Sequence, residues 1–149
     1  MTGTTNAHAV AIAPRTSDRA AARVLALATA LLFVLHGVAH AVGFAGTFGL
    51  SESNAINEGF TLVGGLDTDG LARHALGVLW LVPIPLYVVA AAGLMLRRRW
   101  WAPWALAATF FSTALCVLWL EPAKVGMALN VVILAGLGVY ALVSRRERR

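Results

Sequence analysis

The sequence predicts an all-α fold, a bundle of four transmembrane helices. Hydrophobic residues make up 59% of the 149 residues and charged residues only 13%, whereas soluble domains hold roughly 45–50% and about 25%. The apolar residues lie in four runs, each close to the ~20 residues that cross a hydrocarbon core of about 30 Å. The basic residues stand in short clusters at the ends of these runs. A soluble domain of this length has too small an interior for so much apolar surface.

The four predicted spans cover residues 24–44, 71–96, 102–120 and 125–143. In the first span, Ala39-His40-Ala41 fits the small-residue pattern of a signal-peptide cleavage site. The apolar run continues past this point to Phe44, and the stretch before it is longer than the start of a typical signal peptide. We therefore expect the segment to remain in the protein as a membrane span.

Two prolines interrupt the second span. Pro83 and Pro85 lie near its centre, and a proline removes one backbone N–H donor and clashes with the carbonyl one turn earlier. We therefore expect the second helix to be kinked at Pro83 and Pro85. In a membrane bundle, neighbouring helices can satisfy the carbonyls that such a kink frees, so we expect the kink to serve packing.

The third and fourth spans are joined only by residues 121–124. So short a connection predicts that the two helices pack antiparallel. Tryptophans stand at both ends of the third span: Trp100, Trp101 and Trp104 at its start, and Trp119 at its end. Because Trp is enriched where a span meets the membrane interface, these residues support the predicted boundaries.

The positions of Lys and Arg predict the orientation. One set of span ends carries three basic clusters: Arg15, Arg19 and Arg23, then Arg97 to Arg99, then Arg145, Arg146, Arg148 and Arg149. The opposite set carries only Arg73 and Lys124. The positive-inside rule then predicts a protein of the plasma membrane with both termini in the cytoplasm (N-in/C-in). On this basis residues 1–22 form a flexible tail, residues 23–144 one membrane domain, and residues 145–149 a basic tail.

Residues 45–70 form the long loop on the predicted outer side. Its acidic residues oppose the basic clusters in charge; they are Glu52, Glu58, Asp67 and Asp69. The loop exceeds the usual helix connection of about 2–8 residues, and long loops of this kind often cover a site. A solvated spacer explains the loop equally well, so its role as a lid or a spacer stays open.

Polar side chains gather in the predicted outer half of the membrane. His36 and His40 lie one helical turn apart on one face of the first span. His74 lies about one turn inside the second span, and the junction of the last two spans adds Glu121, Lys124 and Asn130. Ionisable side chains at this depth are costly, so they mark a functional site by default.

Several kinds of chemistry are open to this group. His36, His40 and His74 offer imidazoles to a transition metal, and Glu121 offers a carboxylate. The three histidines are also candidate cofactor ligands, since a haem can be held between facing helices of a bundle. Chains of His and Glu also serve proton transfer within membranes. A structural role stands beside these, in which the histidines, with Lys124 and Asn130, form interhelical hydrogen bonds that fix helix register.

Two short patterns resemble a known group of proteins. The run His36-Gly37-Val38-Ala39-His40, followed by Gly43-Phe44, resembles the first-helix signature of small bacterial four-span membrane proteins of uncharacterised function. A pattern at the junction of the last two spans of that group is matched by Trp119, Glu121, Ala123, Lys124, Gly126 and Asn130. A looser similarity to DoxX-like four-helix proteins rests on architecture. The resemblance implies the four-span fold and no particular activity.

The sequence favours a protein that is not an enzyme. It contains no Ser-His-Asp arrangement, phosphate loop or nucleotide fingerprint, and Ser112 and Thr113 are expected to bond to their own helix. The basic clusters are typical of membrane topology and do not indicate nucleic acid. We therefore expect a non-catalytic or accessory subunit in the lipid bilayer, bound to a larger membrane complex or to a second copy. The alternatives are a metal-, haem- or proton-handling protein and a transport component for a small molecule or lipid.

Overall fold

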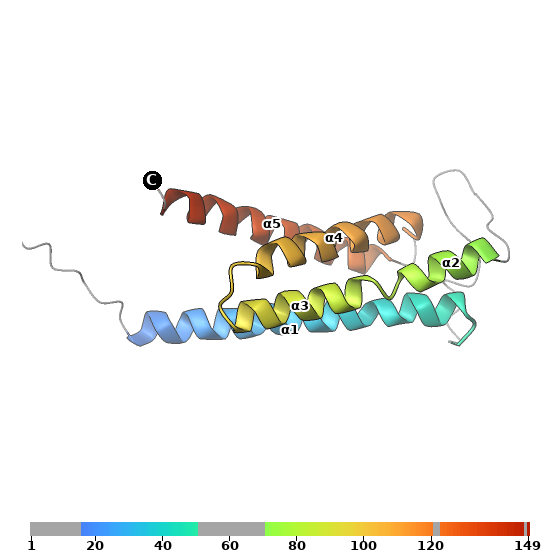
Figure 1. Cartoon of the computed structure of the whole chain (residues 1–149), viewed down its shortest axis with the longest axis horizontal. Coiled ribbons are helices and arrows are strands. Elements are labelled where there is room, and N and C mark those ends of the chain that lie inside the picture. Colours follow the sequence, from blue (N-terminus) through green and yellow to red (C-terminus); the bar gives the residue numbers. More distant parts are fainter. Residues whose placement is uncertain (1–15, 51–70, 121–122, 148) are drawn as a thin grey trace, which may run out of the picture.

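The structure, a computed structural model, describes residues 16–50, 71–120, 123–147 and 149. These residues contain five helices and no strand: α1 (Thr16–Thr47), α2 (Leu71–Leu79), α3 (Pro83–Met95), α4 (Trp101–Leu118) and α5 (Lys124–Arg146) (Figure 1). The predicted all-α class is confirmed. The predicted tail before residue 16 and most of the predicted loop, from 51 to 70, lie outside the described residues.

Four segments are long and apolar enough to cross a membrane: Ser17–Thr47, His74–Met95, Trp101–Leu118 and Lys124–Arg146. They correspond to the four predicted spans, and the chain is a small multi-pass membrane protein by the composition of its helices. The first helix is 32 residues long and begins well before the predicted start at residue 24. Its first turns are rich in Ala and Arg, which are strong helix formers, so the helix extends past the apolar run.

The second predicted span is divided into two helices. Backbone bonds of the tighter three-residue type close the end of α2, from Trp80 N to Gly77 O at 3.1 Å and from Val82 N to Leu79 O at 3.1 Å. Pro83 is the first residue of α3, a position where the missing N–H of proline leaves no bond unmade. The structure therefore ends one helix and begins another where the sequence predicted a kink in a single helix.

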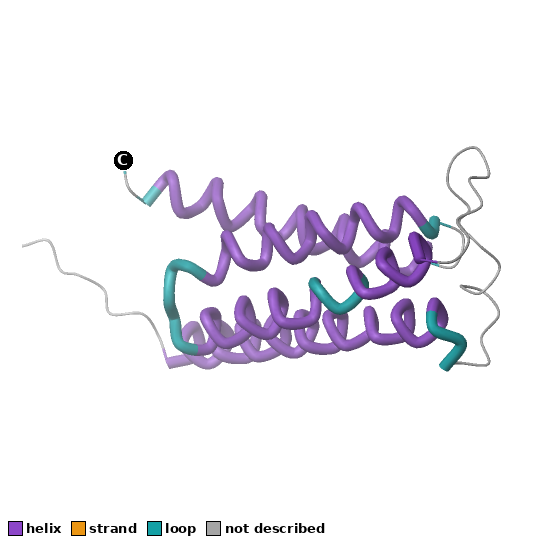
Figure 2. Tube along the Cα trace, turned by 45° about the vertical axis from the view of Figure 1, so that its right-hand side comes forward, coloured by secondary structure: helices purple, strands orange, loops and turns teal. Residues whose placement is uncertain are grey.

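Each long helix packs against a neighbouring one in the bundle. α1 packs on α3, α3 on α4, and α4 on α5, while the short α2 lies against α1 (Figures 1 and 2). The start of α1 and the end of α5 lie at one end of the bundle, and α2 lies at the other. The antiparallel arrangement predicted for the last two spans is seen in α4 and α5.

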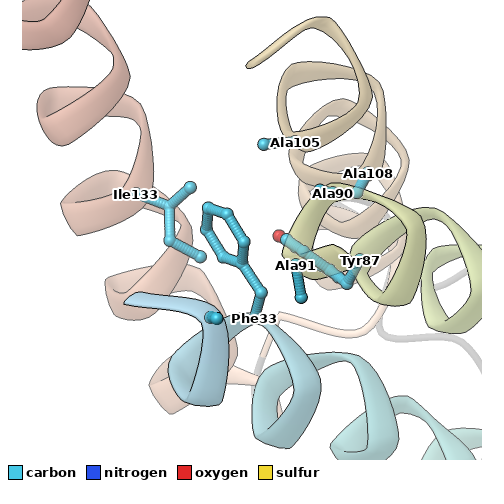
Figure 3. Packing of buried hydrophobic residues seen from close by; sticks show 8 residues of the cluster. Phe33, Tyr87, Ala90, Ala91, Ala105, Ala108 and Ile133 are labelled. Carbon is cyan, nitrogen blue, oxygen red and sulfur yellow. The ribbon is translucent and has the colours of Figure 1, made fainter. Parts of the chain in front are cut away.

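The centre of the bundle combines large and very small side chains. Phe33 of α1, Tyr87 of α3 and Ile133 of α5 meet there, and the rings of Phe33 and Tyr87 are 5.7 Å apart (Figure 3). Four buried alanines of α3 and α4 belong to the same cluster: Ala90, Ala91, Ala105 and Ala108. Small residues allow the helix backbones to approach closely, which is how helices gain packing contacts in a membrane.

A second apolar cluster lies toward the α2 end of the bundle. It contains Trp80, Leu115 and Trp119, and the two indole rings meet edge to face at 5.3 Å. The ring of Trp80 lies directly against the backbone of α1 at Gly43, where a Cβ atom would overlap with it. The break after α2 and the absence of a side chain at Gly43 together bring Trp80 into the bundle.

Most of the outer surface is apolar. In the apolar 18-residue stretch of each of the first three spans, 28–33% of the residues are buried. In that of the last span, only 11% are buried. The exposed large hydrophobic side chains are mainly Val and Leu, which are compatible with lipid tails and incompatible with water over so large an area. This surface supports contact with a lipid bilayer. The compartment and the side on which the termini lie stay predictions.

The two kinds of glycine in this bundle predict opposite mutational effects. We expect Gly43→Ala to destabilise the protein by about 1–3 kcal/mol, since the new methyl group would overlap with the Trp80 ring. Gly136→Ala, in α5, is the matched control: its Cβ would meet nothing within 4 Å, so the better helix propensity of Ala should stabilise by up to about 1 kcal/mol. Thermal unfolding in detergent measures both. Equal effects at the two sites would contradict the packing of Trp80 on α1.

Candidate functional site

Six buried polar side chains meet inside the bundle, and we refer to them as the polar cluster. They come from four helices and are each at most 4% exposed: His36, His40, Tyr87, Thr109, Ser112 and Asn130. Buried polar groups in membrane helices find their hydrogen-bond partners within the protein, since lipid tails cannot supply any. The cluster is therefore the part of the molecule where polar chemistry is concentrated.

The two histidines of α1 are held in a defined geometry. His36 and His40 lie one turn apart, and Nδ1 of His40 donates a hydrogen bond of 2.8 Å to the backbone carbonyl of His36. This bond fixes the proton of a neutral His40 on Nδ1 and leaves Nε2 as an acceptor. The two rings are 5.0 Å apart and nearly perpendicular, at 83°. The histidine pair predicted from the sequence is thus a single, ordered unit.

Asn130 and Ser112 connect this pair to α4 and α5. Oδ1 of Asn130 lies 2.8 Å from Nε2 of His36 and 3.0 Å from Oγ of Ser112. The same Oγ lies 2.8 Å from Nε2 of His40 and 3.3 Å from Nε2 of His36. Three helices are therefore joined through one amide and one hydroxyl group.

The number of protons on these groups limits which of the hydrogen bonds can form at the same time. The hydroxyl of Ser112 has one proton and cannot donate to both His40 and Asn130. With the amide oxygen of Asn130 toward Ser112, both short contacts are hydrogen bonds only if His40 carries a second proton on Nε2. With the amide nitrogen in that place, Ser112 donates to His40 and both imidazoles are neutral. The arrangement with neutral imidazoles therefore places the Asn130 nitrogen toward Ser112.

Tyr87 and Thr109 extend the cluster toward the apolar centre. The Tyr87 hydroxyl lies 3.2 Å from Oγ1 of Thr109 and 3.3 Å from Oδ1 of Asn130. Oγ1 of Thr109 donates to the carbonyl of Ala105, one turn earlier in α4, at 2.7 Å. Tyr87 also packs its ring against that of His36 at 5.2 Å. These residues link the histidines to the helix packing of Figure 3.

The structure brings together only some of the predicted site residues. His36, His40 and Asn130 meet, but His74 is exposed on α2 and packs its ring against Phe48 at 4.9 Å. Lys124 is exposed at the start of α5. Glu121 lies outside the described residues. Among the residues that the structure describes, no group of three or more His, Cys, Asp or Glu side chains is placed to hold a metal ion.

Three members of the cluster were not predicted as site residues. The expectation that Ser112 bonds to its own helix is wrong, because its hydroxyl contacts α1 and α5 instead. Tyr87 and Thr109 resemble any hydroxyl-bearing residue of an apolar helix. A usable signal was the spacing of small and polar residues along one face of α4, at positions 105, 108, 109, 112 and 116, which are all buried.

A pocket lies beside the cluster, between α1 and the first half of α5. Its volume is about 270 Å³, and its walls include His36, His40, Trp80, Cys116 and Gly126. None of the residues that line it carries a formal charge at neutral pH when the histidines are neutral. Gly126 brings the backbone of α5 close to Cys116, since a Cβ at this position would lie 3.2 Å from its Sγ atom. The pocket suits a small uncharged molecule.

Comparison with known proteins finds no match for this chain among family models, curated proteins or solved structures. The four long apolar helices support the broad resemblance to small four-span membrane proteins. Membership of the particular group suggested by the two sequence patterns stays a prediction.

The cluster predicts a large effect of a small change in α5. We expect Asn130→Leu to destabilise the protein by about 1–3 kcal/mol, because His36 and Ser112 lose their buried amide partner. Its neighbour Val131 is exposed, so Val131→Leu should stay within about 0.5 kcal/mol of the parent. Unfolding in mixed micelles measures both variants.

A double-mutant cycle sharpens this test. Since Ser112 and Asn130 share a hydrogen bond, the effects of Ser112→Ala and Asn130→Leu should couple by at least about 0.5 kcal/mol. Strict additivity, or an Asn130→Leu variant as stable as Val131→Leu, would show that the cluster does not hold the helices together.

Proposed function

We propose that this chain is a non-catalytic membrane subunit that associates with a larger membrane partner through α5. The observation that carries the proposal is the one-sided packing of this helix. Only 11% of the residues in the apolar 18-residue stretch of α5 are buried, against 28–33% in the other spans. Asn130 and Ile133 are the only residues of α5 that are buried in the described structure. Most of α5 is therefore available to another membrane helix.

The outward face of α5 has a regular pattern, and we call it the α5 seam. Its residues are all exposed and alternate in spacing between four and three positions: Ala128, Val132, Ala135, Val139 and Leu142. This spacing is that of the a and d positions at which two helices interlock. Alanines within the seam let a partner backbone approach closely, and such packing drives helix association where there is no hydrophobic effect.

The polar cluster fits a structural role within such a subunit. Its hydrogen bonds connect α1, α3, α4 and α5 with one another and direct its polar groups inward. Helix register is fixed in this way, because a shift along any helix would leave buried polar groups without partners. A fixed register keeps the residues of the α5 seam aligned for a partner.

The seam predicts a change in assembly without a change in fold. We expect the double variant Ala128→Leu with Ala135→Leu to lose the partner, since the added bulk blocks close approach. The matched control is Ala92→Leu with Ala114→Leu, which adds the same bulk to exposed positions of α3 and α4. The mass of the complex in mild detergent, measured by light scattering after extraction from the native membrane, distinguishes the variants.

The proposal would be contradicted if the parent protein had the mass of a single copy. It would also be contradicted if the α5 variant kept the same complex as the control. A complex made of two identical chains would place a second copy on the α5 seam and would contradict a larger partner.

A second candidate function is the binding of a small molecule beside His36 and His40. The pocket of about 270 Å³ favours it. Nε2 of His36 is engaged with Asn130 at 2.8 Å, and the His36 side chain forms part of the pocket wall. The buried indole N–H of Trp80, another wall residue, lacks a partner in the described part of the chain. A metal or haem would need further ligands, for which His74 and Glu121 are the candidates proposed from the sequence.

Filling the pocket tests this candidate. We expect the purified parent to retain a bound compound, cofactor or metal at one equivalent per chain. Gly126→Leu places a larger side chain in the pocket and should lose it. Gly136→Leu is the control, since it adds the same side chain to α5 in open space. Organic extraction with mass spectrometry, visible absorption and metal analysis give the readout. Retention in both variants, or nothing bound to the parent, would remove this candidate.

A further inference from the structure

Three arginines gather at the end of the bundle that carries the start of α1 and the end of α3. Arg19 and Arg23 lie one turn apart on α1, and Arg97 lies two residues after the end of α3 at Met95. All three line one pocket of about 790 Å³ between these two helices. Residues from two separate segments therefore direct positive charge toward one place.

No carboxylate is seen to balance this charge. None of the three arginines forms a salt bridge within the described residues, and the nearest acidic residue in the sequence, Asp18, has its hydrogen bond from the hydroxyl of Ser17 at 3.5 Å. Like charges around one pocket raise its potential and attract an anion. Guanidinium groups match the oxygens of phosphate and carboxylate in geometry, since each can donate two parallel hydrogen bonds.

The other wall of the same pocket is apolar. It consists of apolar side chains of α1 and α3: Ala22, Ala26, Leu27, Leu94 and Met95. Leu27 and Met95 are about half exposed, at 59% and 49%. A pocket with a cationic rim and an apolar wall beneath it matches a molecule with an anionic head and a hydrocarbon chain.

The backbone at Arg97 supports a binding role for its side chain. Its φ is +53°, in the left-handed region that favours glycine. The turn is a common helix ending, with Arg98 N bonded to Gly93 O at 2.8 Å. Glycine would form this turn without strain, whereas arginine forms it at some cost to stability and adds a guanidinium group to the pocket.

We propose that this pocket binds the phosphate group of an anionic phospholipid. Arg19, Arg23 and Arg97 contact the phosphate, and one acyl chain lies along Leu27 and Leu94. The proposal does not depend on the subunit function, because the pocket lies between α1 and α3 and the α5 seam faces elsewhere. It differs from general attraction of basic residues to anionic membranes in naming which arginines bind.

Neighbouring arginines provide a matched test. The full chain in detergent is mixed with phosphatidylglycerol or phosphatidylcholine, and bound lipid is measured by native mass spectrometry. We expect the parent to retain one phosphatidylglycerol in preference to phosphatidylcholine. Arg97→Gln should weaken this binding by roughly tenfold, as expected for loss of a charged hydrogen bond. Arg98→Gln removes the same charge one residue away, outside the pocket, and should stay within about twofold.

A further variant separates binding from folding. Arg97→Gly should raise the midpoint of thermal unfolding, because glycine relieves the left-handed turn, and should still lose phosphatidylglycerol. Excess inorganic phosphate should not displace the lipid, because free phosphate makes no contact with the apolar wall. Equal losses in Arg97→Gln and Arg98→Gln would show diffuse attraction and overturn the proposal. Displacement by the same excess of inorganic phosphate would also overturn it.

Discussion

The amide of Asn130 is the interaction on which the rest of this structure depends. It lies 2.8 Å from one histidine of α1 and 3.0 Å from the hydroxyl of Ser112 in α4, and the hydroxyl of Tyr87 in α3 is 3.3 Å away. One side chain of α5 thus touches all three other long helices. In hydrocarbon no solvent can replace these partners, so each group constrains the position of the others. Apolar helices could slide along one another at little cost, but helices joined through a buried amide cannot.

The small residues of the bundle follow from this constraint. Polar contacts near 3 Å require close backbones, and alanines between α3 and α4 together with Gly43 and Gly126 permit that approach. The break between α2 and α3 serves the same end, since it turns Trp80 onto α1 at Gly43. These features keep the polar cluster enclosed on most sides and leave the pocket between α1 and α5 beside it.

The functional proposals separate an inward-facing site from outward-facing surfaces. The cluster uses its polar groups on itself, which favours a role in helix register over catalysis. The surfaces directed at other molecules are the α5 seam and the arginine pocket between α1 and α3. One is apolar and repeats along a helix, and the other is cationic and lies at a helix end. A subunit held in the membrane by lipid and partner contacts would use both.

The sequence by itself determined the fold class, the number of spans and the pairing of the histidines. Those features depend on composition and on the helical repeat, which places residues four apart on one face whatever surrounds them. It also indicated that Asn130 belongs near the histidines, because both lie at similar depths in their spans. Only the tertiary structure decided that Ser112, Tyr87 and Thr109 complete the cluster and that His74 packs against Phe48. The sequence around a hydroxyl in an apolar helix is the same whether the group bonds to its own backbone or to another helix. The rotation of each helix about its axis decides between these two partners, and packing sets that rotation.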